Sequence, residues 1–298
     1  MLGAAAGGGV PQWNCACANC DAARQGRIPR LTQSSVALSA DGVHWFLINA
    51  SPDLRSQFEA FPGLHPIAGK ARSNPFEAVL LTNADLDHTL GLLLLREGEP
   101  LHIHAAPEVR ETLADALGFQ TILNAFCGVQ WHPLPFAEWT GLPCRDGQPS
   151  GLLYRAIALR SAPAAFRSQA DTGNEMTTAF LFKDERTGGT LLLAPDVFEI
   201  APPLARAMET ADAILFDGTF WSEDELGGVK SSARPASRMG HLPIRDGSLA
   251  ALEKCPARHR VYLHINNTNP ILQPDCPERH TVEKAGLVVG LDGMEFEL

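Results

Sequence analysis

The hydrophobic positions of the chain gather into short runs that are typical of buried or half-buried strands. Turn residues separate some of these runs, and stretches with apolar residues at helical spacing separate others. Strands are predicted at residues 34–40, 44–50, 77–82, 101–106, 178–184, 190–196, 213–219 and 260–266. Helices are predicted at residues 53–60, 88–96, 107–117, 199–209, 246–254 and 277–285. The alternation of strands and helices in the later part predicts an α/β architecture with helices covering sheet faces.

The earliest strands are joined differently from the later ones. The sequence SADGVHW, centred on Asp41 and Gly42, is typical of a hairpin turn and predicts an antiparallel or mixed sheet. Residues 141–175 are rich in Gly, Pro and Ser, and a loop region near a site is predicted there. No internal repeat or linker interrupts the chain, so we expect one domain over residues 1–298.

Composition and charge narrow the classes of protein. The chain is 45% hydrophobic and 19% charged, which is typical of an ordered globular protein. It carries 24 Lys and Arg against 34 Asp and Glu, a net charge of −10 without a basic stripe, so nucleic acid and anionic membrane surfaces are unfavourable partners. The most apolar run, residues 88–97, is too short for a membrane span. Without a signal-peptide pattern at its start, the chain is expected in the cytoplasm, where thiols stay reduced.

Three of the seven cysteines lie in the sequence CACANC, as Cys15, Cys17 and Cys20. They could be disulfide partners, metal ligands or reactive thiols. In a reducing compartment metal binding is favoured, and a C-x-C-x2-C pattern supplies three of the four thiolates of a closed zinc site. No neighbouring base would activate a nucleophilic thiol. We therefore predict a structural zinc site rather than a catalytic one.

Polar residues follow directly after three of the apolar strands. They are Asp85, Asp87 and His88 after residues 77–82, Asp217 after residues 213–216, and His264 after residues 260–263. Loops beyond strand ends commonly build the sites of α/β proteins, because rigid strands aim short side chains into a shared cleft. Carboxylates and imidazoles that converge there match a metal site for Zn, Fe or Mn.

Each of these residues also has a structural interpretation. Asp87 could cap the helix that follows, Asp217 could be a turn residue before Gly218, and His264 could be a core histidine. Their joint occurrence favours a ligand set. His241, in the sequence RMGHLP, lies in a loop from which an acid/base histidine could reach a cleft, although a surface histidine fits the same position.

His102 and His104 share a strand face, as zinc-ligand pairs do. No third ligand is expected near them, and a half-exposed strand face accounts for the pair.

Several motifs, in order along nearly the whole chain, resemble one known family. They are GAAAGGGVPQWNCACANC, TQSS (32–35), NASPD (49–53), DLDHTLGLLLLREG (85–98), LFDGT (215–219), RMGH (238–241) and HINNTNPIL (264–272). This set resembles the PqqB family of pyrroloquinoline quinone (PQQ) biosynthesis, within the metallo-β-lactamase-like superfamily. The resemblance implies an αββα sandwich: two mixed β-sheets packed face to face between helices, with metals at one edge.

The superfamily signature T-H-x-H-x-D-H, followed by x-x-G, is altered in this chain. It begins at Thr82 and ends at Gly91, and its first two histidines are replaced by Asn83 and Asp85. The third histidine of the same metal position falls near residues 159–163, which contain no histidine. The resemblance therefore implies that one metal position has lost its imidazoles. The other keeps four ligands, which are Asp87, His88, the bridging-type Asp217 and His264.

What remains is a mononuclear site with two histidines and carboxylates, similar to the ligand sets of non-haem Fe(II) oxygenases. The family implies an Fe(II)- and O2-dependent hydroxylase that acts on the tyrosine ring of the Glu-Tyr-derived PQQ precursor. Asp87, His88 and His264 would hold Fe(II), with Asp217 as a fourth or bridging ligand. Asn83 and Asp85 would line the vacated pocket. His241 is the candidate acid/base or substrate-binding group.

The resemblance also leaves two alternative functions open. A non-catalytic carrier that moves PQQ or its precursor to the periplasm is one, and a zinc hydrolase, disfavoured by Asn83 and Asp85, is another. Zn or another divalent metal could replace iron, and a homodimer or other pathway proteins are possible partners.

In related phosphodiesterases, a histidine three residues after the last active-site histidine completes a similar cysteine cluster. That position is Asn267 here, and Asp275, Cys276 or water are the other candidates for the fourth zinc ligand.

Overall fold

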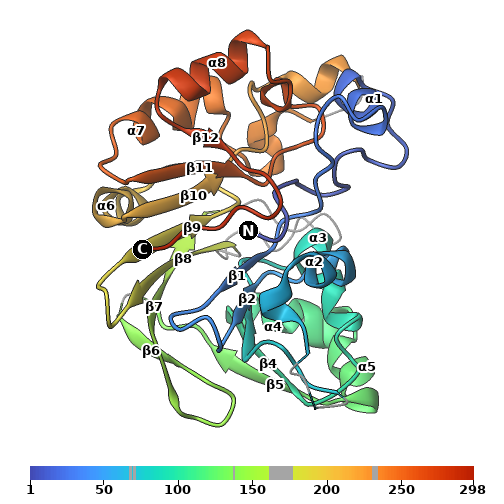
Figure 1. The fold of residues 1–298 in the computed structure, drawn as a ribbon, viewed down its shortest axis with the longest axis vertical. Coiled ribbons are helices and arrows are strands. Elements are labelled where there is room, and N and C mark those ends of the chain that lie inside the picture. Colours follow the sequence, from blue (N-terminus) through green and yellow to red (C-terminus); the bar gives the residue numbers. More distant parts are fainter. Residues whose placement is uncertain (67–68, 70–71, 137, 161–176, 230–233) are drawn as a thin grey trace.

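Two β-sheets packed face to face form the centre of the molecule, with helices on their outer sides (Figure 1). The structure is a computed structural model, and it describes all residues except 67–68, 70–71, 137, 161–176 and 230–233. A single cluster of buried apolar side chains fills the space between the layers. This arrangement confirms the predicted αββα sandwich.

The first sheet has five strands in chain order, which are β1 (Val36–Leu38), β2 (Phe46–Ile48), β3 (Ala78–Leu80), β4 (Leu101–Ala105) and β5 (Val129–Pro133). The second has seven strands in the order β12 (Val288–Val289), β11 (His259–Leu263), β10 (Ala213–Asp217), β9 (Thr190–Ala194), β8 (Thr177–Asp184), β7 (Pro149–Leu159) and β6 (Thr140–Pro143). Both sheets are mixed: β1 is antiparallel to β2 in the first, and the second changes from parallel to antiparallel pairing between β9 and β8.

The helices are short, and several continue into 3₁₀ or π turns. They are α1 (Ala18–Arg24), α2 (Leu54–Ala60), α3 (Leu86–Thr89), α4 (Pro107–Glu111), α5 (Phe119–Phe126), α6 (Pro202–Thr210), α7 (Leu249–Glu253) and α8 (Pro277–Lys284). Figure 1 places α2, α4 and α5 beside the five-stranded sheet, and α7 and α8 beside the seven-stranded sheet. No helix in the described part of the chain combines the length and the hydrophobicity needed to cross a bilayer.

Most of the predicted elements are present, including the hairpin between β1 and β2 around Asp41. The prediction of a loop at 141–175 was wrong for its first part, which contains the end of β6 and all of β7, whereas residues 161–175 lie outside the described residues. The helices α1 and α5 and the strand β5 were not predicted. The last long strand ends at Leu263 rather than at residue 266, which leaves His264 at the start of a turn.

The expectation for His102 and His104 was also incomplete. The side chain of His104 is buried, and its Nδ1 shares a hydrogen bond of 3.0 Å with the Tyr154 hydroxyl. A third imidazole, His132 from the unpredicted β5, stacks on His104 with ring centroids 4.7 Å apart, and its Nε2 lies 3.2 Å from Nδ1 of His102. These three imidazoles do not form one of the groups of described residues that could hold a metal ion.

We expect this histidine cluster to make the fold acid-sensitive. Burial, together with His132 and His102, lowers the pKa of His104 from 6.5 to about 3. The unfolded chain binds a proton that the folded chain does not, so stability is lost as the pH falls below 6.5. From His104 alone the free energy of unfolding should fall by about 2 kcal/mol between pH 7 and pH 5.

Urea unfolding at a series of pH values measures this loss. The His104→Gln variant should have a flatter pH dependence, whereas the exposed His280→Gln substitution in α8 should leave the dependence unchanged. An equal slope in wild type and His104→Gln would contradict the assignment.

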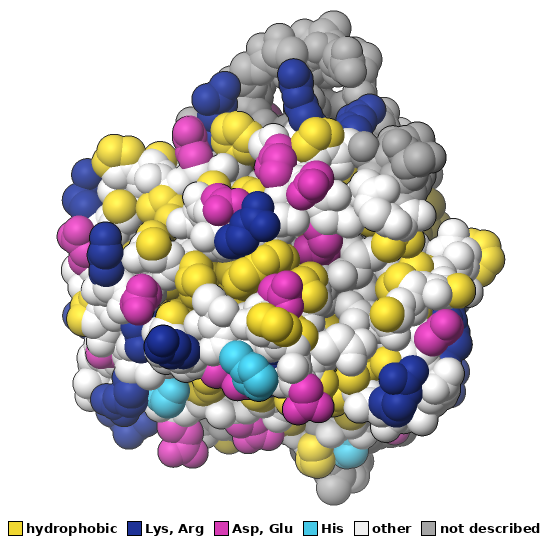
Figure 2. All heavy atoms as spheres, turned by 90° about the horizontal axis from the view of Figure 1, so that it is seen from above, with side chains coloured by type: hydrophobic (Ala, Val, Ile, Leu, Met, Phe, Trp, Pro, Cys, Tyr) yellow, Lys and Arg dark blue, Asp and Glu magenta, His cyan; other side chains and the backbone are white. Residues whose placement is uncertain are grey.

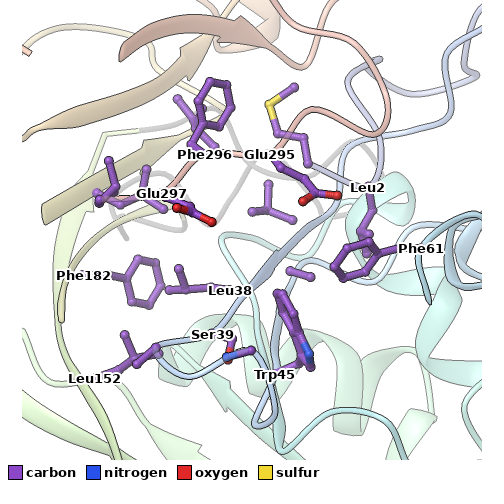
Figure 3. Close-up of a pocket in the computed structure, with 18 of the residues that line it drawn as sticks. Leu2, Leu38, Ser39, Trp45, Phe61, Leu152, Phe182, Glu295, Phe296 and Glu297 are labelled. Atoms are coloured by element: carbon purple, nitrogen blue, oxygen red, sulfur yellow. The ribbon is translucent and has the colours of Figure 1, made fainter. Parts of the chain in front are cut away.

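Neither the face drawn in Figure 2 nor the cavity drawn in Figure 3 marks the candidate metal centres. On the face drawn in Figure 2, the described Lys and Arg side chains are interspersed with Asp and Glu. A cavity of about 1040 Å³ lies between the sheets, and Figure 3 shows its walls, with Trp45, Phe61, Phe182 and Phe296 among them. None of the described residues that could hold a metal ion lines this cavity.

Candidate metal centres

The candidate catalytic residues come together at one edge of the sandwich because strand ends meet there. The strands β9, β10 and β11 are parallel neighbours, and Asp196, Asp217 and His264 lie at or just beyond their carboxyl ends. The loop between β3 and α3 brings Asp87 and His88 to the same edge from the other sheet. This is the position at which α/β proteins usually place their ligands.

Two overlapping groups of side chains could each hold a metal ion. The first is Asp87, His88 and His264, and the second is Asp196, His241 and His264, with the ligand atoms of each group all within 4.8 Å of one another. In the first group, Nε2 of His264 lies 3.3 Å and Nε2 of His88 lies 3.8 Å from Oδ2 of Asp87. The predicted residues Asp87, His88 and His264 therefore lie together, and His241 adjoins them.

The buried Nε2 atom of His88 tests whether this group fits a metal. It has no hydrogen-bond partner among the described residues, and the imidazole is completely buried. A buried polar atom without a partner is costly, and a cation at this position would satisfy it. The group Asp87, His88 and His264 therefore fits a divalent metal.

Asn83 orients this site, although it occupies a position where the superfamily signature has a histidine. Its Oδ1 lies 2.9 Å from Nδ1 of His88 and accepts a hydrogen bond from the Asp85 amide at 3.0 Å, while its Nδ2 donates to Oδ2 of Asp196 at 3.1 Å. With Nδ1 of His88 donating to Asn83, the lone pair of Nε2 is left for a metal ion. Residues that orient ligands in this way commonly tune metal affinity.

His264 is held in a strained backbone conformation at the end of β11. Its φ of 56° is left-handed, which is uncommon for a residue other than glycine and is tolerated where the surrounding structure enforces it. Thr219 supplies that support, because its Oγ1 lies 2.8 Å from Nδ1 and 2.9 Å from the backbone oxygen of His264. Nε2 of His264 is thereby directed at Asp87 and Asp196.

Asp217 was predicted as a metal ligand, but both of its carboxylate oxygens have other partners. Oδ2 lies 2.8 Å from Nδ1 of His241 and accepts from the Val197 amide at 2.9 Å, and Oδ1 accepts from Oγ1 of Thr219 at 2.6 Å. Asp217 belongs to neither metal-capable group of the described residues. Here it orients His241 and Thr219, which themselves face the site.

Asp196 is the site residue that sequence reasoning missed. It belongs to the second group and also lies beside the first, with Oδ1 3.7 Å from Nε2 of His264 and Oδ2 3.6 Å from Nδ1 of His88. Like Asp217, it is an acidic residue at the end of an apolar run: Asp217 is the last residue of β10, and Pro195 alone separates Asp196 from β9. That shared pattern could have identified it.

The electrostatic field of the site favours positive charge. Burial alone would lower the pKa of His264, but Asp196, Asp87 and Asp217 outweigh it and raise the pKa to about 10. Burial and the neighbouring carboxylates Asp87 and Asp196 raise the pKa of Asp85 to about 6. Asp85 can therefore carry a proton near neutral pH, whereas the histidines beside Asp87 hold its pKa well below the usual range despite burial.

A glycine in the altered signature is required by close packing. The Gly91 amide donates to the Ala50 oxygen at 2.9 Å, and a Cβ atom at this position would lie 2.3 Å from the Ser51 oxygen. The helix that carries Asp87 and His88 can approach this loop only because residue 91 lacks a side chain.

The three clustered cysteines form a third metal-capable group, with no disulfide among the seven cysteines. Nδ2 of Asn267 lies 3.2, 3.5 and 3.3 Å from the sulfurs of Cys15, Cys17 and Cys20. Of the other candidates for a fourth ligand, Cys276 donates from its thiol to the Pro270 oxygen and caps α8, and Asp275 is exposed. The Asn267 amide is thus the side chain that faces all three sulfurs.

The fold and the comparisons with known proteins define the class of protein. A model of the β-lactamase superfamily domain matches residues 44–265. The chain belongs to the coenzyme PQQ synthesis protein B family of that superfamily. It is 41% identical to coenzyme PQQ synthesis protein B of Methylococcus capsulatus over 100% of this chain and 99% of the relative. It is also 41% identical to that of Azotobacter vinelandii, with the same coverage.

Solved structures agree with this assignment. The crystal structure of Zn(2+)-bound PqqB from Methylobacterium extorquens aligns with a TM-score of 0.89 and 37% identity over 100% of this chain and 98% of that one. A diphosphatase of the PhnP family aligns with a TM-score of 0.67 at 21% identity, over 100% of this chain and 96% of that one, and shares the fold.

Proposed function

We propose that the chain is an Fe(II)- and O2-dependent hydroxylase of PQQ biosynthesis that acts on the tyrosine-derived ring of the Glu-Tyr precursor. The family supports a place in PQQ synthesis, since its members are named for that process. One observation carries the finer proposal: Asn83, in place of a histidine ligand, binds His88 and Asp196 through hydrogen bonds. A dinuclear hydrolytic centre needs ligands at that position, so a mononuclear site is favoured.

Asp87, His88 and His264 would hold the iron, and a further carboxylate, that of Asp196, has Oδ1 3.7 Å from Nε2 of His264. Two imidazoles with a carboxylate form the ligand set of non-haem Fe(II) oxygenases. Bound Fe(II) would supply the chemistry that activates dioxygen. Other divalent metals, Zn among them, fit the same ligands.

The chain's own residues would orient groups and move protons. Asp217 holds Nδ1 of His241 at 2.8 Å, which leaves Nε2 of His241 for the substrate or a proton. Asp85, whose pKa is raised to about 6 by burial and the nearby carboxylates, could exchange a proton with bound substrate. Both are therefore our candidates for acid/base catalysis.

The cysteine cluster would hold a structural zinc ion. Cys15, Cys17 and Cys20 would supply three thiolates, and the Asn267 amide, rotated so that Oδ1 faces the sulfurs, would supply the fourth ligand.

The proposal predicts oxygen consumption that depends on Fe(II) and on the precursor. Protein reconstituted anaerobically with Fe(II) is mixed with the Glu-Tyr-derived precursor, O2 and a reductant. The reductant is included because hydroxylation with release of water needs two further electrons. An oxygen electrode and mass spectrometry should record O2 uptake and a hydroxylated product. Protein loaded with Zn alone is the control and should be inactive.

Two other outcomes would overturn the proposal. Tight binding of PQQ or its precursor without turnover, retained in an Asp87→Ala/His264→Ala variant, would indicate a carrier. Hydrolysis of a phosphodiester or lactam by the zinc-loaded protein would indicate a hydrolase.

A further inference from the structure

The candidate catalytic centre and the cysteine cluster share one loop. His264 belongs to the first, Asn267 belongs to the second, and only two residues separate them. The connection is made by ordered contacts at both ends of the loop, which suggests that the two sites do not act independently.

At its far end the loop is fixed to the segment that carries the cysteines. The Asn267 amide lies within 3.5 Å of all three sulfurs. The buried side chain of Asn19, between Cys17 and Cys20 in the sequence, donates through Nδ2 to the backbone oxygens of Asn267 at 3.0 Å and Asn269 at 2.8 Å. The position of residues 267–269 is therefore set by the cysteine segment.

At its near end the loop holds His264 through Thr219. The backbone N–H of Asn266 donates to the backbone oxygen of Thr219 at 3.1 Å. The fully buried Asn269 donates through Nδ2 to the backbone oxygen of Gly218 at 2.9 Å. Thr219 in turn contacts both Nδ1 and the backbone oxygen of His264. The left-handed backbone of His264, with φ of 56°, is uncommon outside glycine and persists where surrounding contacts such as these enforce it.

We infer that Asn267 is a positioning residue for the catalytic metal: by fixing the loop to the cysteine cluster, it keeps His264 directed at Asp87. This inference rests on the proposed metal sites but not on the proposed reaction. If the tether is cut, the strained backbone of His264 can relax, and Nε2 moves away from the ligand position. The catalytic centre should then bind its metal more weakly, although no catalytic ligand has been changed.

Electron paramagnetic resonance of bound Mn(II) tests the inference without turnover, because Mn(II) prefers the oxygen and nitrogen ligands of the catalytic centre over thiolates. We expect the Asn267→Ala variant to bind Mn(II) roughly tenfold more weakly, with an altered spectrum, as for loss of an outer-shell partner. Asn19→Ala, which leaves the cysteines and Asn267 in place, should shift affinity in the same direction. Asn14→Ala, at an exposed asparagine beside Cys15, is the matched control and should match wild type.

A conservative replacement separates positioning from general stability. Asn267→His keeps a metal-binding side chain opposite the sulfurs and should restore Mn(II) affinity, whereas thermal melting by circular dichroism reports whether each variant folds. Wild-type Mn(II) affinity in both folded Asn267→Ala and folded Asn19→Ala would overturn the inference. If Asn267→Ala does not fold, the result for Asn19→Ala decides. A wild type that binds Mn(II) tightly but hydroxylates nothing would overturn the proposed reaction and leave this inference standing.

Discussion

The His264→Ala variant is expected to lose catalytic-site metal binding by roughly 100-fold or more. His264 belongs to both metal-capable groups of the edge, so its removal disrupts each of them. Loss of an orienting partner alone commonly costs between tenfold and 100-fold in metal affinity, and loss of a direct ligand should cost at least as much. Titration with Mn(II), followed by electron paramagnetic resonance, measures the change.

Two further variants make this prediction specific. Thr219→Val keeps the imidazole but removes the hydroxyl that supports it, and should weaken binding by roughly tenfold to 100-fold. His65→Ala changes an exposed histidine and should have no effect. Near-normal affinity in His264→Ala would mean that the metal is held elsewhere.

The Cys20→Ser variant is expected to lose one zinc ion per chain and much of its stability. Cys20 is buried, and its sulfur accepts hydrogen bonds from the side-chain Nδ2 of Asn267 and from the backbone N–H of Gln12. Since a bound metal stabilises only the folded chain, a site filled at about 1,000 times its Kd contributes about 4 kcal/mol. For a chain of 298 residues the corresponding fall in Tm is about 6 °C.

Zinc analysis and calorimetry on the same preparations measure both effects. Cys255→Ser, at a partly buried cysteine outside the cluster, is the matched control and should keep its zinc and its Tm. An unchanged zinc content in Cys20→Ser would contradict the structural role assigned to the cluster.

The strand pattern predicted much of the fold because apolar runs mark buried strands regardless of context. The same reasoning predicted that Asp87, His88 and His264 converge, since each follows an apolar strand, and the structure places them in one group that could hold a metal ion. It did not distinguish Asp217 from Asp196: both follow buried strands, and only their partners in space separate them. Asp217 contacts Thr219 and His241, whereas Asp196 belongs to one of the metal-capable groups.

Other features could not be found from local sequence. The strand β7 lies in a segment whose Gly, Pro and Ser content indicates a loop, and its antiparallel pairing with β8 overrides that local preference. The stacking of His132 on His104 depends on the register of β4 and β5, which are separated by two helices along the chain. The role of Asn83 as an orienting residue appears only when His88 and Asp196 are seen on either side of it.

Labelled oxygen tests the central claim most directly. The iron-loaded protein is given the precursor and a reductant under oxygen-18 gas in ordinary water, and the product is examined by mass spectrometry. If the mononuclear centre is an oxygenase, each new hydroxyl should carry the heavy isotope from the gas. A product whose new oxygen comes from water, or a precursor that is left unchanged, would contradict the account.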